Sequence, residues 1–306
     1  MDSRNKKLAM NIICNSISLK PGDNLLVEIT GEDGLELANE IIKQAKKINA
    51  NPILNLIRYK ELKEFLINSS KEKIIDFARK SNMTLTEFKN FYYNVCNVNY
   101  NKMKIAMEPL QKLMNKTDKV HIVAPGTDLI FSIKGIPAEK YYGTFNIPDG
   151  EVATCPIKDS VNGYITYSTK TKYNDIMFEN IRFEFVNGKI VKETADKNTK
   201  ELNQILDTDN GARYIGEFAF GLNPYINNTI CDTLFDEKIN GSFHFTPGMS
   251  LEKSDNGNRS AIHWDIVKIL RKEFGGGKIY FDNVLINKDG NFVLDELKLL
   301  NAENLI

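Results

Sequence analysis

Residues 21–57 read P-G-D-N-L-L-V-E-I-T-G-E-D-G-L-E-L-A-N-E-I-I-K-Q-A-K-K-I-N-A-N-P-I-L-N-L-I, and this stretch decides the fold of the N-terminal third. Its first nine residues, 21–29, predict a turn followed by a short buried strand. From Glu32 onward, apolar residues recur every three or four positions, which is the spacing of one helix face. Residues 52–57 form a second apolar strand. A strand, a helix and a strand in so short a stretch form a βαβ unit, so we expect a parallel sheet with a right-handed crossover.

The turn after the first strand, T-G-E-D-G at 30–34, does not predict nucleotide binding. It lacks the G-x-G-x-x-G spacing, and it places two acidic residues where a pyrophosphate would sit. Helices are expected next, at 59–80, 84–96 and 100–116. The second of these has a clear start signal, because Thr84 and Glu87 three residues later form a capping box.

The pattern changes from helical to strand-like at about residue 117. Strands are expected at 120–123, 129–133, 152–157, 161–168, 181–186 and 189–193, and a helix at 198–207. The last two strands are separated by Asn187-Gly188, which is a strong hairpin signal. We therefore expect two domains: an α/β domain with a parallel sheet over residues 1–116 and an α+β domain over residues 117–306.

Composition and charge narrow the class of protein. The chain has 306 residues, of which 42% are hydrophobic and 26% charged, as in an ordinary globular protein. Lys and Arg together number 40, and so do Asp and Glu, so the net charge is zero. A nucleic-acid-binding protein would normally show a basic face, so no nucleic-acid partner is expected.

The cysteines and the N-terminus indicate a cytoplasmic protein. Four cysteines, Cys14, Cys96, Cys155 and Cys231, are widely scattered without a C-x-x-C pair, which is typical of reduced thiols. The charged start M-D-S-R-N-K-K and the polar residues that interrupt the next apolar stretch do not make a signal peptide. No run of 18 apolar residues occurs, so no membrane span is expected.

Histidine is scarce, and this scarcity points to a metal site in the C-terminal half. Two of the three histidines, His244 and His263, lie close together in the sequence. His263 begins the triplet His263-Trp264-Asp265. In an extended strand, residues i and i+2 point to the same side, so His263 and Asp265 could reach one ion while Trp264 packs in the core on the opposite side. Imidazole and carboxylate are common ligands of Zn, Mn, Co and Fe.

Two glutamates stand in surroundings that suggest burial. Glu151 follows N-I-P-D-G at the start of an apparent strand, and Glu217 lies in Y-I-G-E-F-A-F-G. A buried carboxylate needs a compensating cation, and a metal ion can supply it. Asp149, next to Glu151, is interpreted as part of a turn, because P-D-G is a preferred turn composition.

With these segments in view, the chain resembles the metallopeptidase family M29. The similar segments are T-D-K-V-H-I-V-A-P-G-T-D-L-I-F-S-I-K-G (117–135), F-N-I-P-D-G-E-V (145–152), Y-I-G-E-F-A (214–219), L-F-D-E-K-I-N-G-S-F-H-F (234–245) and S-A-I-H-W-D (260–265). Their order matches that of the family. Full-length members are longer, and the N-terminal third is similar only loosely.

The resemblance implies a function and a set of ligands. Carried over position by position, the family's metal ligands are Glu151, Glu217, His244, His263 and Asp265. They would hold two divalent metal ions (Zn, Co, Mn or Mg) in a metal-binding catalytic domain over residues 117–306. Glu151 and Glu217 would be the catalytic carboxylates. The expected activity is that of an aminopeptidase acting on small peptides, and the expected assembly is a homodimer.

One departure from the family pattern leaves alternatives open. Family members carry a tyrosine shortly after the histidine equivalent to His244, whereas here F-T-P-G-M-S-L-E follows. The resemblance implies that this tyrosine helps to stabilise the tetrahedral oxyanion, and Arg259 or Lys253 could supply positive charge in its place. A mononuclear non-haem iron ring-cleaving dioxygenase that uses His244, His263 and Asp265 is the first alternative. A metal-binding protein without catalysis is the second.

Overall fold

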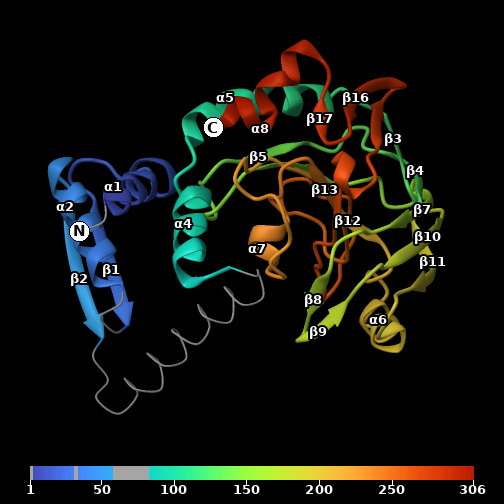
Figure 1. Cartoon of the computed structure of the whole chain (residues 1–306), viewed down its shortest axis with the longest axis horizontal. Helices are drawn as coiled ribbons and strands as arrows, with labels where there is room; N and C mark the ends of the chain where they lie inside the picture. The colour runs from blue at the N-terminus through green and yellow to red at the C-terminus, as the bar shows by residue number, and fades with distance from the viewer. Residues whose placement is uncertain (1–2, 31–33, 58–82) are drawn as a thin grey trace. The chain divides into compact units, whose positions relative to one another are not determined.

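A computed structural model describes residues 3–30, 34–57 and 83–306 and divides the chain into two compact units (Figure 1). Unit 1 comprises residues 1–100 and 143–148, and unit 2 comprises residues 101–142 and 149–306. The helix expected at 59–80 lies outside the described residues. The functional division into residues 1–116 and 117–306 stays a prediction.

Unit 1 contains the strand–helix–strand stretch that the sequence predicts. Its elements are α1 (Ser3–Met10), the π-helix η1 (Asn11–Ser16), β1 (Asn24–Thr30), α2 (Leu35–Lys47), β2 (Asn51–Ile57) and α4 (Leu85–Cys96). Strands β1 and β2 pair in parallel, with Leu26 opposite Ile53. The helical spacing within α2 places Ile41 and Ala45 in a small hydrophobic core with Ile13 and Leu25.

The predicted capping box at the start of α4 is confirmed. The backbone N–H of Glu87 donates to Thr84 Oγ1 over 3.2 Å, and the backbone N–H of Thr84 donates to Glu87 Oε2 over 2.7 Å. These two hydrogen bonds satisfy backbone donors that a helix start would otherwise leave free, so the helix begins where the sequence predicts.

Unit 2 is built mainly from antiparallel sheets. The larger sheet has eight strands in the order β11-β10-β7-β4-β3-β15-β16-β17, and the smaller has five in the order β14-β13-β12-β6-β5. In the larger sheet the strands are β3 (Lys119–Ala124), β4 (Thr127–Ser132), β7 (Asn162–Thr166), β10 (Arg182–Val186), β11 (Lys189–Thr194), β15 (Lys278–Phe281), β16 (Val284–Lys288) and β17 (Asn291–Phe292). In the smaller they are β5 (Glu139–Tyr141), β6 (Glu151–Thr154), β12 (Ile215–Gly221), β13 (Ser242–Pro247) and β14 (Val267–Ile269).

A short hairpin and several helices complete unit 2. They are β8 (Thr171–Tyr173) with β9 (Ile176–Phe178), α5 (Tyr100–Met114, in unit 2 from Asn101 onward), α6 (Thr199–Leu206), α7 (Thr233–Asp236), α8 (Ala302–Leu305) and the 3-10 helices η2 (Lys272–Phe274) and η3 (Asp295–Leu300). Among the strand pairs of the described residues, only β1–β2 is parallel. The chain therefore has a mixed α/β fold in which most sheets are antiparallel, and parallel pairing is limited to one strand pair of unit 1.

An aromatic layer between the two large sheets forms the core of unit 2. The ring of Phe131 on β4 lies 5.1 Å from that of Phe218 on β12 and 5.0 Å from that of Phe245 on β13. Phe220 on β12 reaches Phe292 on β17 at 5.4 Å. Alternate residues of a strand point to opposite faces, so the F-x-F patterns of β12 and β13 direct their rings into this layer. The other face of the smaller sheet is left for polar residues.

The predicted hairpin between β10 and β11 is confirmed. Asn187 and Gly188 both have positive φ, 49° and 82°, as a tight two-residue hairpin turn requires. A side chain at Gly188 would meet the carbonyl oxygen of Lys158 at 1.9 Å, so glycine is needed there for space as well.

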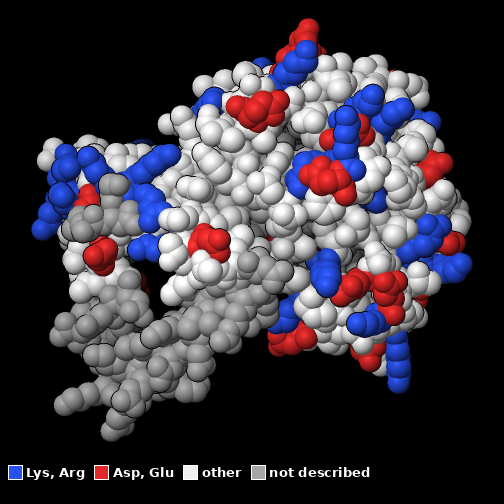
Figure 2. All heavy atoms as spheres, in the orientation of Figure 1, with Lys and Arg blue, Asp and Glu red and all other residues white. Residues whose placement is uncertain are grey.

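The described residues show no membrane helix, and the visible face of unit 2 is not strongly basic (Figure 2). No described helix is long and apolar enough to cross a bilayer. On the face of unit 2 that Figure 2 shows, basic and acidic side chains are interspersed, which agrees with the balanced composition.

Candidate metal centre

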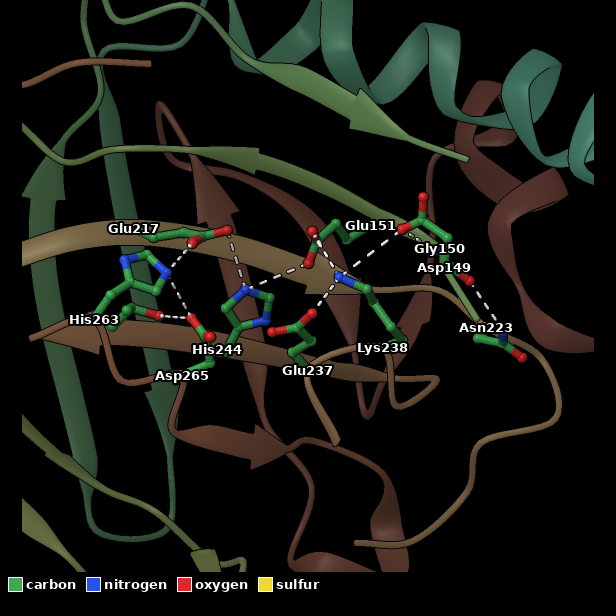
Figure 3. Close-up of polar contacts among 11 residues, drawn as sticks. Asp149, Gly150, Glu151, Glu217, Asn223, Glu237, Lys238, His244, His263 and Asp265 are labelled. Carbon is green, nitrogen blue, oxygen red and sulfur yellow. Dashed lines mark hydrogen bonds and ion pairs between the residues drawn. The ribbon is translucent and has the colours of Figure 1, made fainter. Parts of the chain in front are cut away.

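The polar face of the five-stranded sheet collects the predicted ligands. In the register of this sheet, Glu217 is opposite Thr246, and Ala219, two residues further along β12, is opposite His244. Glu151 on β6 is opposite Gly221, which lies on the same face of β12. Asp265 comes two residues before Val267, the partner of His244 on β14. The pleat of the sheet thus directs side chains from distant segments toward one place (Figure 3).

All five predicted ligands come together, in two groups that share Glu217. His244 Nε2 lies 3.2 Å from Glu217 Oε1 and 3.5 Å from Glu151 Oε2. His263 Nε2 lies 3.1 Å from Glu217 Oε2 and 3.2 Å from Asp265 Oδ1. Within each group, the ligand atoms are all within 4.8 Å of one another. Each oxygen of Glu217 therefore faces a different group, as Figure 3 shows.

The two groups differ in their exposure to solvent. Glu151, Glu217 and His244 are buried, and so is Asp265. The side chain of His263, by contrast, is 34% exposed. The group of Glu217, His263 and Asp265 therefore opens to solvent, whereas the group of Glu151, Glu217 and His244 is enclosed.

The proton affinities of these side chains reflect crowded charges in a buried site. Burial raises the pKa of Glu151 to about 7, although the nearby Lys238 ammonium opposes this. Burial alone would lower the pKa of His244, but the hydrogen bond to Glu217 and the surrounding carboxylates raise it to about 9. Burial alone would also lower the pKa of His263, but Asp265 and Glu217 raise it to about 12. Both imidazoles thus carry a positive charge in the absence of a metal ion.

The residues fit a metal ion in three respects. Glu151 Oε2 is buried and has no hydrogen-bond partner among the described residues, and a buried oxygen without a hydrogen bond is costly. His263 Nδ1 lies 2.9 Å from the carbonyl oxygen of Met249, which makes Nδ1 the donor and leaves Nε2 to face the carboxylates. Thr246 donates its hydroxyl to Asp265 Oδ1 over 2.7 Å and orients that carboxylate. Three carboxylates and two imidazoles are a ligand set suited to Zn, Mn, Co or Fe.

A buried lysine next to the site was missed by sequence reasoning. Lys238 is 1% exposed, and its Nζ lies 2.8 Å from Glu151 Oε1 and 2.5 Å from Glu237 Oε1. Asp149 Oδ1 lies 3.9 Å from the same nitrogen. The sequence gives no local signal of this burial, because Lys238 ends the charged triplet Asp236-Glu237-Lys238 and charged runs are normally exposed.

Two expectations about neighbouring residues need correction. Asp149 accepts the backbone N–H of Gly150, and it is also fully buried and faces Lys238. The triplet that begins at His263 is not a regular strand, because His263 forms only an isolated bridge with Gly248 and β14 starts at Val267. The bridge still brings the imidazole to Asp265.

Two further residues singled out from the sequence are placed clearly. Trp264 packs in the core as predicted, with its ring 4.8 Å from Tyr173 and 5.1 Å from Phe178. Its indole N–H donates to Thr171 Oγ1 over 3.2 Å. Arg259 is paired with Asp255 through two contacts of 2.7 and 2.6 Å. The guanidinium is therefore already engaged by a carboxylate.

The described residues combine a mixed α/β fold with a buried cluster of carboxylates and imidazoles that could hold metal ions, and comparison with known proteins shows the family of the chain. The family model of the thermophilic metalloproteases (M29) matches residues 81–292. The chain belongs to this family.

The chain matches named relatives over only part of their length. The chain is 30% identical over 164 residues to aminopeptidase AmpS of Bacillus subtilis (strain 168), which covers 49% of this chain and 39% of the relative. It is 32% identical over 171 residues to aminopeptidase T of Thermus thermophilus, which covers 48% of this chain and 41% of the relative. The matched segments thus span about two fifths of the length of these relatives.

Two solved structures share the fold. Wild-type AmpT from Thermus thermophilus superposes with a TM-score of 0.70 at 16% identity, covering 95% of this chain and 99% of that chain. The 2,5-dihydroxypyridine dioxygenase of Pseudomonas putida KT2440 superposes with a TM-score of 0.67 at 14% identity, covering 97% and 100%. At these identities the likeness shows the fold alone, which two different chemistries evidently use.

Proposed function

We propose that this chain is a metal-dependent aminopeptidase that removes N-terminal residues from small peptides and uses two divalent ions. The observation that carries the proposal is the shared position of Glu217, with one oxygen toward His244 and the other toward His263. A carboxylate shared by two ligand groups would suit two metal ions held side by side. Membership of a metalloprotease family and the names of the relatives support the reaction class.

The charge of the cluster supports two ions rather than one. An imidazole must be neutral to bind a metal ion. With His244 and His263 neutral, the ammonium of Lys238 is the cation that remains beside the carboxylates of the cluster. These carboxylates are Asp149, Glu151, Glu217, Glu237 and Asp265. In their ionised form they leave four uncompensated negative charges, which two divalent cations would balance.

The protein's own side chains have separable roles in the proposed reaction. When bound, the two ions would acidify a water molecule and polarise the scissile carbonyl. We assign Glu151 and Glu217 as the catalytic carboxylates that hold and move the proton of that water. Lys238 fixes one oxygen of Glu151 and leaves the other directed at the cluster. The exposed edge of His263 marks the side from which a peptide enters.

The geometry favours this proposal over a mononuclear dioxygenase. Among the described residues, each group that could hold a metal ion includes Glu217, and neither consists of His244, His263 and Asp265. The dioxygenase alternative needs those three residues alone. We place catalysis in the predicted domain over residues 117–306, while the cytoplasmic location and the homodimer stay predictions.

A peptidase assay tests the proposal. The purified chain, supplied in turn with Zn²⁺, Co²⁺, Mn²⁺ or Mg²⁺, is given a panel of short peptides with free N-termini and the same peptides acetylated at the N-terminus. We expect release of the first residue from the free peptides alone, and loss of this activity with a chelator. Cleavage of neither set with any metal, or oxygen uptake with Fe²⁺ and a dihydroxylated ring substrate, would overturn the proposal.

A further inference from the structure

The ligand face of the five-stranded sheet continues beyond the candidate ligands to the edge strand β5. Tyr141 on β5 is directly opposite Glu151 on β6. In an antiparallel sheet, residues directly opposite each other point to the same face with their Cβ atoms about 5 Å apart. The side chains of Tyr141 and Glu151 therefore stand next to each other, on the same face of the sheet from which Glu217 and His244 project further along the next two strands.

We propose that Tyr141 is a catalytic residue whose phenolic O–H donates a hydrogen bond to the substrate's carbonyl oxygen as that carbon becomes tetrahedral. This inference rests on the proposed aminopeptidase function. It assigns the donor to a strand that contributes none of the five candidate ligands.

The chemistry of the ligand face explains why a neutral donor is needed there. Carboxylates only accept hydrogen bonds when ionised, and imidazoles that bind a metal through Nε2 cannot donate from that atom. Lys238 is 1% exposed and already engaged by Glu151 and Glu237, so its ammonium is shielded from a substrate. A phenol keeps its proton at neutral pH and is a donor of hydrogen bonds.

Exposure distinguishes Tyr141 from the buried carboxylates on the same face of the sheet. Tyr141 is half-buried, whereas Glu151 and Glu217 are buried, so part of Tyr141 is accessible to solvent. Burial and then the charges of Glu217 and Glu151 raise the pKa of Tyr141, which is consistent with a phenol near both carboxylates. Tyr173, the tyrosine beside His263, is less suited because its ring packs on Trp264 at 4.8 Å.

The test compares Tyr141→Phe with Tyr142→Phe in the metal-loaded protein. Tyr142, the next residue, has its ring 5.1 Å from the Lys104 ammonium, and its substitution also removes one hydroxyl. Four quantities are measured: kcat and KM on a free peptide, metal content by elemental analysis, and affinities by calorimetry for a phosphonate peptide analogue and for the product amino acid. The phosphonate reproduces the tetrahedral carbon, and the amino acid does not.

For Tyr141→Phe we expect kcat to fall by about a hundredfold, which is the usual effect of removing one oxyanion donor. Affinity for the phosphonate falls by a similar factor, while KM, metal content and amino-acid affinity change little, and Tyr142→Phe resembles the wild type. Wild-type kcat and phosphonate affinity in Tyr141→Phe would overturn the inference, and so would loss of metal from this variant. If the wild type itself neither cleaves peptides nor binds the phosphonate, the proposed function fails and takes this inference with it.

Discussion

The two faces of the five-stranded sheet are both buried, yet they hold opposite kinds of side chain. On β13, Phe243 and Phe245 enter the aromatic layer, while His244 between them enters the ligand cluster. On β12, Phe218 and Phe220 alternate with Glu217 in the same way. The comparison teaches that one sheet can stabilise the fold through its aromatic face and concentrate charge on the other.

The physical demands of the two faces differ. The aromatic face is held by area removed from water and by close packing, so its residues can be exchanged for others of similar volume. The ligand face is costly unless each carboxylate has a cation, so its stability depends on Lys238, on protons or on metal ions. Changes on the first face should therefore alter stability, and changes on the second should alter metal binding and activity.

Glu217→Ala should have the largest effect, because its carboxylate serves both ligand groups. We expect kcat/KM to fall on the order of 10⁴-fold, as when a residue that acts within a catalytic unit is lost. The control is His121→Ala, which removes a half-exposed histidine paired with Asp128 on the larger sheet. Peptide hydrolysis is measured for both. Activity in Glu217→Ala within tenfold of the control would contradict the shared role.

Phe218→Ala should lower the stability of the fold without affecting metal binding, because Phe218 lies on the aromatic face. Its ring is fully buried between Phe131 and Phe220, so truncation leaves a cavity and lowers the free energy of unfolding by about 3–5 kcal/mol. Urea unfolding measures this loss. At a temperature where the variant stays folded, its metal content and kcat should match the wild type. A selective loss of metal at unchanged stability would show that the two faces are not separable.

Lys238→Met should destabilise the metal-free protein by about 3 kcal/mol, since breaking a buried ion pair leaves a charge uncompensated. The matched control is the double variant Lys238→Met/Glu151→Gln, which removes both charges of the closest pair. We expect the double variant to be more stable in urea than Lys238→Met alone. If the two substitutions lowered the free energy of unfolding additively in the double variant, the ammonium of Lys238 and Glu151 would not interact.

The smallest expected effect concerns Lys268, a basic residue on the aromatic face opposite Phe243. Burial lowers its pKa to about 8, although its Nζ donates to the carbonyl oxygens of Pro125 and Thr166 at 3.2 and 2.6 Å. Between pH 8 and the ordinary lysine pKa, the unfolded chain binds more protons at this residue than the native one, so native stability rises with pH.

The contribution of Lys268 to this rise should be about 2 kcal/mol, since one pKa unit corresponds to about 1.4 kcal/mol. Urea unfolding of the wild type and Lys268→Met at pH 7.5 and pH 10 isolates it, because other titrating groups are common to both proteins. The wild type should gain stability relative to the variant as pH rises. An unchanged difference between the two proteins would contradict the lowered pKa.

The sequence was informative where a signal is local. The capping box at Thr84, the turn at Asn187-Gly188 and the helical spacing of residues 35–47 each depend on a few neighbouring residues, and each is found as predicted. The five candidate ligands stood out because histidine is scarce and because Glu151 and Glu217 interrupt apolar segments. The structure brings together the five residues that the resemblance implied.

Features that depend on the pairing of distant strands could not be predicted. Tyr141 meets Glu151 only through the register of β5 on β6, and nothing near Tyr141 in the sequence indicates that partner. Lys238 is a basic residue in a charged triplet, which normally indicates solvent exposure. Its burial follows from the carboxylates that strand packing brings around it, and the mostly antiparallel pairing of unit 2 is a tertiary property of the same kind.

The most direct test of the two-ion centre is the metal content of the wild type and of Glu217→Ala, measured by elemental analysis after gentle purification and dialysis against divalent metal. The account predicts close to two divalent ions per wild-type chain and a clear loss from Glu217→Ala, with His121→Ala unchanged. A single iron per chain that survives the loss of Glu217, or no bound metal in the replete wild type, would contradict it.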